Sequence, residues 1–294
     1  MNAVILGYGV VGKGIEILAK TLDDINIKYV YVRKEKENLP YFSNNEDMVV
    51  QDDIDIVFEC LNGLEPANTL IQKALKKGKH VISSNKAVVA TYLDTYLELE
   101  EEYGGSIQVE ACVAGGIPFI DALLKLKRLE PLQGYEGIFN GTSNYILDSM
   151  QKNNLDFEDV LKEAQDKGYA EKDPSNDIDG VDVYYKTKIS NSLAFNTPIV
   201  DIPYYAGIRT IKMLDIKFIK MNNKVIRHLS ISRQIDDKII SIIAPCCMDE
   251  NDFLANVPSN YNAQKILSHS FDTLGYYGQG AGQLPTAQAM VQNA

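Results

Sequence analysis

The chain has 294 residues, 45% hydrophobic and 23% charged, a composition typical of folded globular proteins. It carries 40 acidic and 29 basic residues, and the formal net charge of −11 at pH 7 argues against a broad nucleic-acid-binding surface. No apolar run approaches the ~20 residues of a membrane span, and the N-terminus lacks the pattern of a secretory signal. Its 4 cysteines show no zinc spacing. We therefore expect a cytoplasmic protein with free thiols and with no membrane or nucleic-acid partner.

The first third of the chain alternates predicted strands with predicted helices. Short apolar or β-branched runs predict strands at 2–6, 27–33, 53–60, 80–86 and 106–116. Helical periodicity between them predicts helices at 10–22, 67–78 and 90–103. This alternation is typical of an open parallel sheet covered by helices.

The pattern becomes irregular beyond about residue 120. Helices are predicted at 118–129, 142–153 and 157–168, and from Val181 onwards. Strand-like runs are found at 135–141, 216–221, 225–232 and 238–245. We therefore predict an α/β protein with an N-terminal Rossmann domain over 1–128. A second α/β domain over 129–280 would have a mixed or antiparallel sheet.

A glycine-rich motif lies between the first predicted strand and the first predicted helix. It is GxGxxG, and its residues are Gly7, Tyr8, Gly9, Val10, Val11 and Gly12. The first glycine turns the chain, the second lets the backbone approach a pyrophosphate, and the third lets helix and strand pack closely. The free N–H groups of the helix N-terminus would then face the phosphates. The motif predicts a dinucleotide site, and a plain turn is the alternative.

The end of the second predicted strand bears on the choice of cofactor. An acidic residue there would bind the ribose 2′-hydroxyl, whereas arginine accommodates a 2′-phosphate. The sequence has Arg33 and Lys34 at this point and no carboxylate before Glu35. This favours NADP over NAD, while two solvated cations at a strand end are the alternative.

A second group of polar residues lies at 168–186. Asp182 and Lys186 are spaced i and i+4 on a predicted helix, on a face that borders its apolar stripe. Such a pair is usually a solvated surface ion pair. In a partly dry cleft, however, the lysine could hold a substrate carbonyl or alkoxide and relay its proton. The preceding carboxylates Glu171 and Asp177 could bind an ammonium group.

Taken together, these motifs resemble those of the homoserine dehydrogenase family. The resemblance rests on GYGVVG (7–12), NGLEPA (62–67), SSNKA (83–87), EACVAGGIP (110–118), FNGTSNYIL (139–147), GYAEKDPSNDIDGVDVYYK (168–186), YYAGI (204–208) and GQGAGQLPTA (278–287). They span nearly the whole chain in the family's order. The segment 139–186 is specific to the family, whereas the glycine motif is shared by many dehydrogenases.

The resemblance implies an activity and an architecture. The family reduces L-aspartate 4-semialdehyde to L-homoserine with NAD(P)H, in the biosynthesis of threonine, methionine and isoleucine. It also implies that 281–294 packs back on the Rossmann domain, and that the second domain binds substrate and forms a homodimer. The chain stops soon after the PTA motif, so we expect no ACT regulatory domain and no threonine feedback through one.

The resemblance also implies roles for individual residues. Lys186 corresponds to the family's acid–base lysine, Asp182 to its partner and Lys86 to a second active-site lysine. The implied substrate-binding residues are Glu171, Asp177, Asn140, Gly141, Thr142 and Tyr169. The implied additional cofactor-binding residues are Asn62, Gly63, Ser83, Lys86 and Gly280. The oxygens of Glu110, Val113, Gly115 and Ile117 resemble the family's monovalent cation site, which suits Na⁺.

The sequence departs from the family pattern at two places, and two other functions are possible alternatives. The segment 34–52 is short, and Cys112 stands where a small Ser-like or Thr-like residue would be more usual. Cys112 could be the nucleophile of a thiol-dependent aldehyde dehydrogenase, with His80 as the one candidate base in the first half. A small buried cysteine is the commoner explanation. The other alternative is a non-catalytic homologue that binds NADPH.

Overall fold

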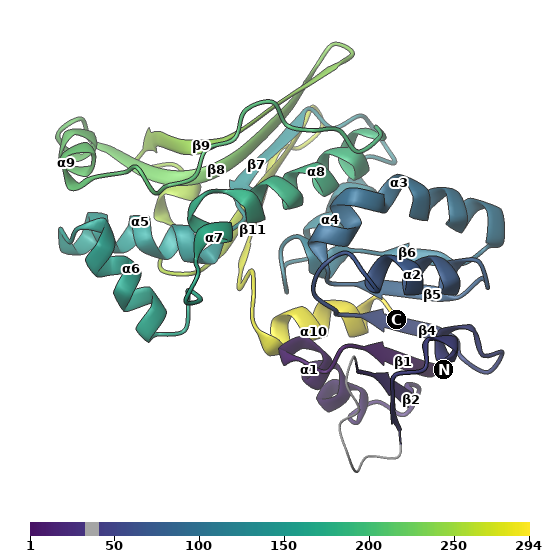
Figure 1. Ribbon diagram of the computed structural model, residues 1–294. Coiled ribbons are helices and arrows are strands. Elements are labelled where there is room, and N and C mark those ends of the chain that lie inside the picture. The colour runs from purple at the N-terminus through teal and green to yellow at the C-terminus, as the bar shows by residue number, and fades with distance from the viewer. Residues whose placement is uncertain (33–40) are drawn as a thin grey trace. The chain divides into compact units, whose positions relative to one another are not determined.

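The computed structural model describes residues 1–32 and 41–294. It forms two compact units, Met1–Pro118 with Ala281–Ala294, and Phe119–Gly280 (Figure 1). The division follows Pro118, earlier than the expected boundary at residue 128. The reason is that α4 (Phe119–Leu126) packs on α8 (Val181–Phe195) of the second unit. In the described ranges, 1–32 and 41–294, no helix is long and apolar enough to cross a membrane.

The first unit is built on a six-stranded sheet in the order β3-β2-β1-β4-β5-β6, in which all neighbouring strands are parallel. The strands are β1 (Asn2–Leu6), β2 (Asn26–Tyr31), β3 (Phe42–Ser43), β4 (Ile56–Glu59), β5 (His80–Ser83) and β6 (Ser106–Gln108). The strand order reverses beside β1, so the turns after β1 and β4 flank the crevice where open α/β sheets bind ligands. The predicted Rossmann-like fold is confirmed.

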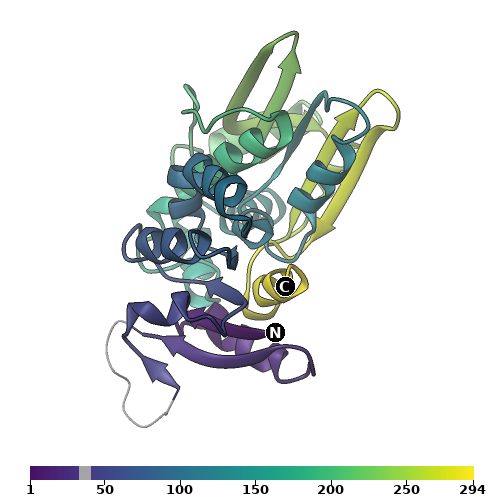
Figure 2. The same ribbon diagram turned by 90° about the vertical axis from the view of Figure 1, so that its right-hand side faces the viewer.

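The C-terminal helix lies in the first unit, next to the N-terminal helix. Helix α1 (Val10–Ala19) and helix α10 (Gln283–Gln292) lie side by side in both views (Figures 1 and 2). A Cβ on Gly14 would be 2.8 Å from the Ala287 Cβ, so only glycine permits this approach. The two helices bury apolar side chains against β1, whose residues Ala3 to Leu6 are fully buried.

The other helices of the first unit are α2 (Ala67–Leu75) and α3 (Lys86–Tyr103), with 3₁₀ turns at Glu46–Val50 and Glu110–Cys112. Helix α3 begins at Lys86 rather than at residue 90, because the Asn85 side chain caps it. The strand expected over 106–116 ends at Gln108. A 3₁₀ turn follows it, and Gly115 then takes a φ of +59°, which bends the chain away from the sheet.

The second unit contains a five-stranded sheet in the order β11-β10-β7-β8-β9, and every ladder in it is antiparallel. The strands are β7 (Gly134–Ile138), β8 (Lys224–Ile235), β9 (Lys238–Asp249), β10 (Asn262–Ser268) and β11 (Asp272–Gly278). An antiparallel sheet was one of the two predicted forms. In Figure 1, β8 and β9 form the long green hairpin.

Helices cover one face of this sheet. Helices α5 (Gly141–Asn153), α8 and α9 (Met213–Met221) contact its strands, and α4, α6 (Phe157–Asp166) and α7 (Ser175–Ile178) pack on α5 or α8. The Tyr135 hydroxyl of β7 donates to Thr187 O (3.2 Å) and Asn191 Oδ1 (2.7 Å) of α8. These contacts fix α8 on β7 and place the segment 181–186 at the edge of the core.

One predicted strand is a helix. Residues 216–221 (IKFIKM) are rich in apolar residues but belong to α9, where Ile216 and Ile219 are buried and Phe218 is exposed. The N–H of Lys212 donates to Asp215 Oδ2 at 2.8 Å, which stabilises the helix start. Apolar spacing in a run this short fits both periods, and the packing of the two isoleucines decided for the helix.

Candidate active site

The turn after β1 is shaped by its glycines. Gly7 has a φ of +97°, and its N–H donates to Tyr31 O at 3.0 Å. A Cβ on Gly12 would lie 2.1 Å from Gly7 O, so this position excludes any side chain. A Cβ on Gly9 would meet nothing within 4 Å. The protein's own packing therefore leaves the space above Gly9 open, as a phosphate requires.

The N-terminus of α1 is open to an anion. Gly9 is its N-cap residue and makes no side-chain capping hydrogen bond, and the first turn contains no acidic residue. The first N–H groups of the helix thus have no internal acceptor, and the helix dipole favours negative charge there. Val10 is exposed at this end and Val11 is half-buried. The loop fits the pyrophosphate of a dinucleotide.

Tyr8 of the same loop is anchored through its hydroxyl, which donates to Glu16 Oε2. This hydrogen bond is the main reason why the pKa of Tyr8 is raised to about 12. The Tyr8 ring also packs edge-on against Phe42 at 4.8 Å. Its phenol is therefore neutral and fixed at physiological pH.

The other predicted cofactor residues lie at three places. Asn62 and Gly63 are in the turn after β4, Ser83 ends β5, and Lys86 begins α3. Because β1, β4 and β5 are adjacent and parallel, these turns share one edge of the sheet with the glycine loop. Gly280 ends the second unit, where a Cβ would lie 1.9 Å from Asn262 Nδ2. The predictions on Arg33 and Lys34 lie outside the described residues.

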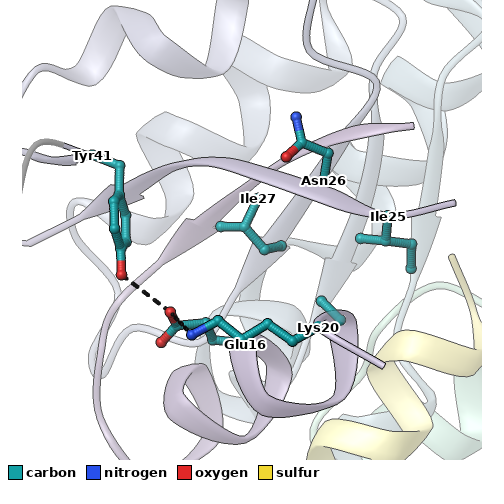
Figure 3. Close-up of a pocket in the computed structure, with 7 residues that line it drawn as sticks. Glu16, Lys20, Ile25, Asn26, Ile27 and Tyr41 are labelled. Carbon is teal, nitrogen blue, oxygen red and sulfur yellow. Dashed lines mark hydrogen bonds and ion pairs between the residues drawn. The ribbon is translucent and has the colours of Figure 1, made fainter. Parts of the chain in front are cut away.

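A pocket of about 340 Å³ lies beside α1 and the start of β2 (Figure 3). Its lining residues are Glu16, Ala19, Lys20, Ile25, Asn26, Ile27 and Tyr41. The Glu16 carboxylate is already compensated there by Lys20 (2.7 Å) and the Tyr41 hydroxyl (3.1 Å). The phosphate-binding N–H groups are at the opposite end of α1, so we do not assign this pocket to the pyrophosphate.

In the second unit, Lys186 and Asp182 form a buried ion pair. Lys186 Nζ lies 2.9 Å from Asp182 Oδ2, and only 9% and 6% of the two side chains are exposed. The ammonium also donates to Phe139 O at 2.6 Å. A pair this deeply buried is not the solvated surface pair of the alternative interpretation. The carbonyl and carboxylate hold the lysine ammonium in one place.

Asn140 joins this pair to a second carboxylate. Its Nδ2 donates to Asp177 Oδ1 (2.8 Å) and to Asp182 Oδ2 (2.9 Å), while its Oδ1 accepts from Ser143 N (2.7 Å) and caps α5. The two amide hydrogens thus bridge two carboxylates that would otherwise repel each other. One ammonium and two carboxylates leave this cluster with a net negative charge, which suits a cationic substrate group.

The remaining predicted substrate residues do not all take part in this hydrogen-bonded cluster. Thr142 Oγ1 donates to Tyr169 O at 2.6 Å, which fixes the loop before α7. Gly141 is required because a Cβ would lie 2.5 Å from Asn260 O. Glu171 is exposed, and its backbone oxygen accepts a hydrogen bond from Gln165 Nε2 (3.0 Å). The structure therefore gathers these predicted residues around α5 but leaves the Glu171 carboxylate outside the hydrogen-bonded cluster.

Comparison with known proteins identifies the family. The model described as "Homoserine dehydrogenase" matches residues 118–294, and the one described as "Homoserine dehydrogenase, NAD binding domain" matches 7–110. The chain belongs to the homoserine dehydrogenase family.

Individual homoserine dehydrogenases are similar over most of the chain. One from Synechocystis is 36% identical over 98% of this chain and 71% of its own length. One from Neisseria gonorrhoeae is 39% identical over 83% of this chain, and the match spans 57% of that relative. A crystal structure of a homoserine dehydrogenase from Thiobacillus denitrificans has a TM-score of 0.94 at 35% identity. It covers 100% of this chain and 72% of that one.

The family membership and the geometry do not favour the thiol-dependent alternative. Cys112 is buried, and its thiol donates to Ser83 O at 3.1 Å. Burial raises the pKa of this thiol far above its ordinary value, so no thiolate forms near neutral pH. His80, the candidate base, contacts Ser106 Oγ at 2.9 Å on the exposed start of β5.

Sequence reasoning missed a buried histidine in this member of the homoserine dehydrogenase family. His228 of β8 is 1% exposed, and its ring lies 2.9 Å from Ala206 O and 3.3 Å from Ser143 Oγ. Burial lowers the pKa of His228 to about 4, so the ring is neutral. It connects the sheet to the turn at 204–208 and to the start of α5. The only available signal was its position inside an apolar, alternating strand.

Glu59 is a second residue that the motifs did not reveal. It ends β4 and is fully buried. Its signal in the sequence is a glutamate at the end of an otherwise apolar run that predicts a buried strand. A carboxylate in such a place requires hydrogen-bond donors from the protein.

Proposed function

We propose that this chain interconverts L-aspartate 4-semialdehyde and L-homoserine with a nicotinamide cofactor, as a cytoplasmic biosynthetic enzyme. The observation that carries the proposal is the buried Lys186–Asp182 pair, bridged by Asn140 to Asp177 inside the segment that matches the family model. The glycine loop of the first unit fits the cofactor, which when bound supplies the hydride for the aldehyde carbon.

Lys186 is the proposed acid–base group. Its ammonium donates a hydrogen bond to the aldehyde oxygen and transfers a proton from Nζ to the alkoxide that develops there. Asp182 and Phe139 O hold Nζ in place before the reaction. Lys86, in the first unit, is the proposed second lysine for polarising the carbonyl.

The carboxylates are proposed to select the substrate by its ammonium group. Asp177 lies in the short helix α7, and Asn140 holds its Oδ1 beside the Lys186–Asp182 pair. Glu171 is proposed to contact the same ammonium, because its exposed side chain is free to turn. Gly141, Thr142 and Tyr169 then shape the wall of the substrate site.

The deciding experiment is the oxidation of L-homoserine by purified protein, followed by the absorbance of NADPH. Lys186→Ala should lower kcat by ~10²–10⁴ with a much smaller change in KM, because the interaction is made in the transition state. Lys188→Ala on the same helix is the control, since its ammonium pairs with Asp201 instead (2.9 Å). A raised KM with an unchanged kcat would contradict the catalytic role. A folded protein that binds NADPH without turnover would support the non-catalytic alternative.

We further propose that the cofactor is preferentially NADP and that Arg33 and Lys34 accommodate its 2′-phosphate. The proposal rests on residue type at the end of the second strand. In Arg33→Ala, the ratio of kcat/KM with NADP⁺ to that with NAD⁺ should fall by about ten-fold. An unchanged ratio would assign the choice of cofactor to other residues.

A monovalent cation site is proposed at the segment 110–117. Glu110 is 3% exposed and begins the 3₁₀ turn Glu110–Cys112, and Val113, Gly115 and Ile117 follow that turn closely in the chain. Oxygen ligands of this kind suit a hard cation such as Na⁺. Thermal unfolding should shift upward in Na⁺ relative to choline, and Glu110→Gln should abolish the shift. An equal unfolding temperature in both salts would contradict the proposed cation site.

A homodimer through the second sheet is also proposed. The sheet face opposite Tyr135 exposes Ile240 (56%), Ile242 (38%) and Tyr277 (50%). Exposed apolar side chains on one face are typical of an interface between subunits. Light scattering should show a dimer that Ile240→Asp with Ile242→Asp converts to monomer. Leu214→Asp on α9 is the control, because Leu214 is even more exposed (76%) but belongs to a helix and not to this sheet face.

A further inference from the structure

A buried carboxylate joins two neighbouring turns in the first unit. Glu59 Oε1 accepts from Leu61 N at 2.9 Å, in the turn after β4. Its Oε2 accepts from Ser83 Oγ at 2.5 Å, at the end of β5. The backbone oxygen of Glu59 accepts from Ser84 N at 3.0 Å. The side chain and the main chain of one residue thus fix both turns to each other.

The connection continues to the start of α3, where Lys86 is the first residue. Asn85 N donates to Ser83 Oγ at 3.1 Å, and Asn85 Oδ1 accepts from Val88 N at 3.4 Å as the N-cap of α3. Asn85 Nδ2 donates to Gly63 O at 2.8 Å. The direction in which α3 leaves the sheet therefore depends on the same hydroxyl that Glu59 holds.

The surroundings of Glu59 leave its charge without a cation. In the part of the chain that the structure describes, no ammonium or guanidinium forms an ion pair with it. Tyr96 of α3, Cys112 of the 3₁₀ turn and the adjacent Cys60 face it, and all three are neutral. The charge of Lys86 lowers the pKa of Cys112, and the charge of Glu110 raises it. Burial raises the pKa of Glu59 to about 7, against the lowering effect of its hydrogen bonds.

We propose that Glu59 is a positioning residue for the reaction, which orients Lys86 through Ser83 and Asn85 and holds the Asn62–Gly63 turn in the same arrangement. This inference rests on the proposed function, in which Lys86 polarises the carbonyl. The ionised carboxylate is the active form, because it accepts all the hydrogen bonds described above. When protonated, Glu59 must donate to Ser83 Oγ, which reverses the direction of that hydrogen bond and loosens the support of Asn85.

The test compares Glu59→Gln with a matched control. Glutamine has the shape of the protonated acid, so this variant should lose about ten-fold in kcat above pH 7. The wild-type protein should show an inflection of kcat near pH 7, and Glu59→Gln should remove it. Glu100→Gln is the control, since Glu100 also accepts from a backbone N–H (Ile107, 2.8 Å) but lies near the other end of α3.

A double-mutant cycle distinguishes positioning from a merely structural role. In a Lys86→Ala background, Glu59→Gln should change kcat by less than about two-fold, because the residue through which it acts is absent. Ser83→Ala should move the inflection to higher pH, since the hydroxyl that lowers the pKa of Glu59 is lost. This variant also serves if Glu59→Gln does not fold.

Each outcome decides the proposal. Two results would overturn the proposal. One is an inflection near pH 7 that persists in Glu59→Gln. The other is a loss of kcat from Glu59→Gln that is as large in the Lys86→Ala background as in the wild-type protein. A wild-type protein without homoserine turnover would instead refute the proposed function. The same cycle measured as the Kd of NADPH by fluorescence then still tests the coupling of Glu59 to Lys86.

Discussion

The glycine loop of the first unit is shaped by its backbone, whereas the cluster around Lys186 in the second unit consists of side chains that hold one another. At the glycine loop, what matters is the shape left by Gly7, Gly9 and Gly12 and the open N-terminus of α1. In the second unit, Lys186 and Asp182 are held by Phe139 O and Asn140. A backbone site tolerates change in the side chains around it, but a network of side chains depends on every member.

Each unit also contains a buried titratable group, and the two groups carry opposite charges when they are ionised. The first unit contains Glu59, which prefers to be protonated, and the second contains His228, which prefers to be neutral. Burial explains both, since it disfavours the charged form of each group. One unit should therefore lose stability as the pH rises and the other as it falls.

The largest expected effect comes from adding a methyl group to the glycine loop. Gly12→Ala places a Cβ 2.1 Å from Gly7 O, and the backbone has to move. We expect a loss of about 3 kcal/mol or more in the free energy of unfolding and no measurable NADPH binding. Urea denaturation and fluorescence titration measure the two quantities.

Gly9→Ala in the same loop is the matched control. Its Cβ meets nothing within 4 Å, so the stability should stay within about 0.5 kcal/mol of wild type. NADPH binding should still weaken by about ten-fold, because the methyl group occupies the space of the pyrophosphate. Unchanged affinity in Gly9→Ala would show that this loop does not contact the cofactor.

The next effect is the pH dependence of the two buried groups. Between pH 4.5 and about 7 the folded state keeps a proton on Glu59 that the unfolded chain releases, so stability falls as the pH rises. Between pH 6.5 and about 4 the unfolded chain binds a proton at His228 that the folded state refuses, so stability falls as the pH decreases. Each effect amounts to about 3 kcal/mol.

Denaturation at several pH values separates the two effects. Glu59→Gln should flatten the decline above pH 4.5 and leave the acid side unchanged, whereas His228→Asn should do the opposite. If both variants changed the stability in the same pH range, the assignment of the two pH effects to Glu59 and His228 would be wrong.

A smaller effect is expected from the side-chain network of the second unit. Asn140→Ala removes the cap of α5 and the bridge between Asp177 and Asp182, which should cost about 1–2 kcal/mol of stability and lower kcat. Asn45→Ala is the control, because Asn45 caps a 3₁₀ turn (Asp47 N, 2.9 Å) and belongs to neither site. Equal losses of activity in both variants would remove the special role of Asn140.

The smallest effect should come from a surface ion pair near the cluster. Asp201 lies 2.9 Å from Lys188 Nζ, but 83% of its side chain is exposed. Solvent screens such a pair, so Asp201→Ala should leave kcat and the unfolding midpoint as in wild type. A clear loss of activity would mean that the helix face beyond Lys186 also contributes to the site.

Much of the first unit could be predicted because its signals are local. A buried parallel strand is an unbroken apolar run, and the glycine motif specifies its own turn. Where adjacent residues did not decide, prediction was wrong: 216–221 form part of α9, and the strand expected over 106–116 ends at Gln108. Short apolar runs fit a helix or a strand, and long-range packing makes the choice.

The sequence by itself determined the alternation of strands and helices, the glycine loop and the pairing of Asp182 with Lys186, because each depends on residues within a few positions of one another. Only the tertiary structure decided that this pair is buried. It also brought in Asn140 from 42 residues away to bridge Asp182. Glu59 and His228 were likewise undecided, because burial and hydrogen-bond partners come from chain segments that meet only in the folded protein.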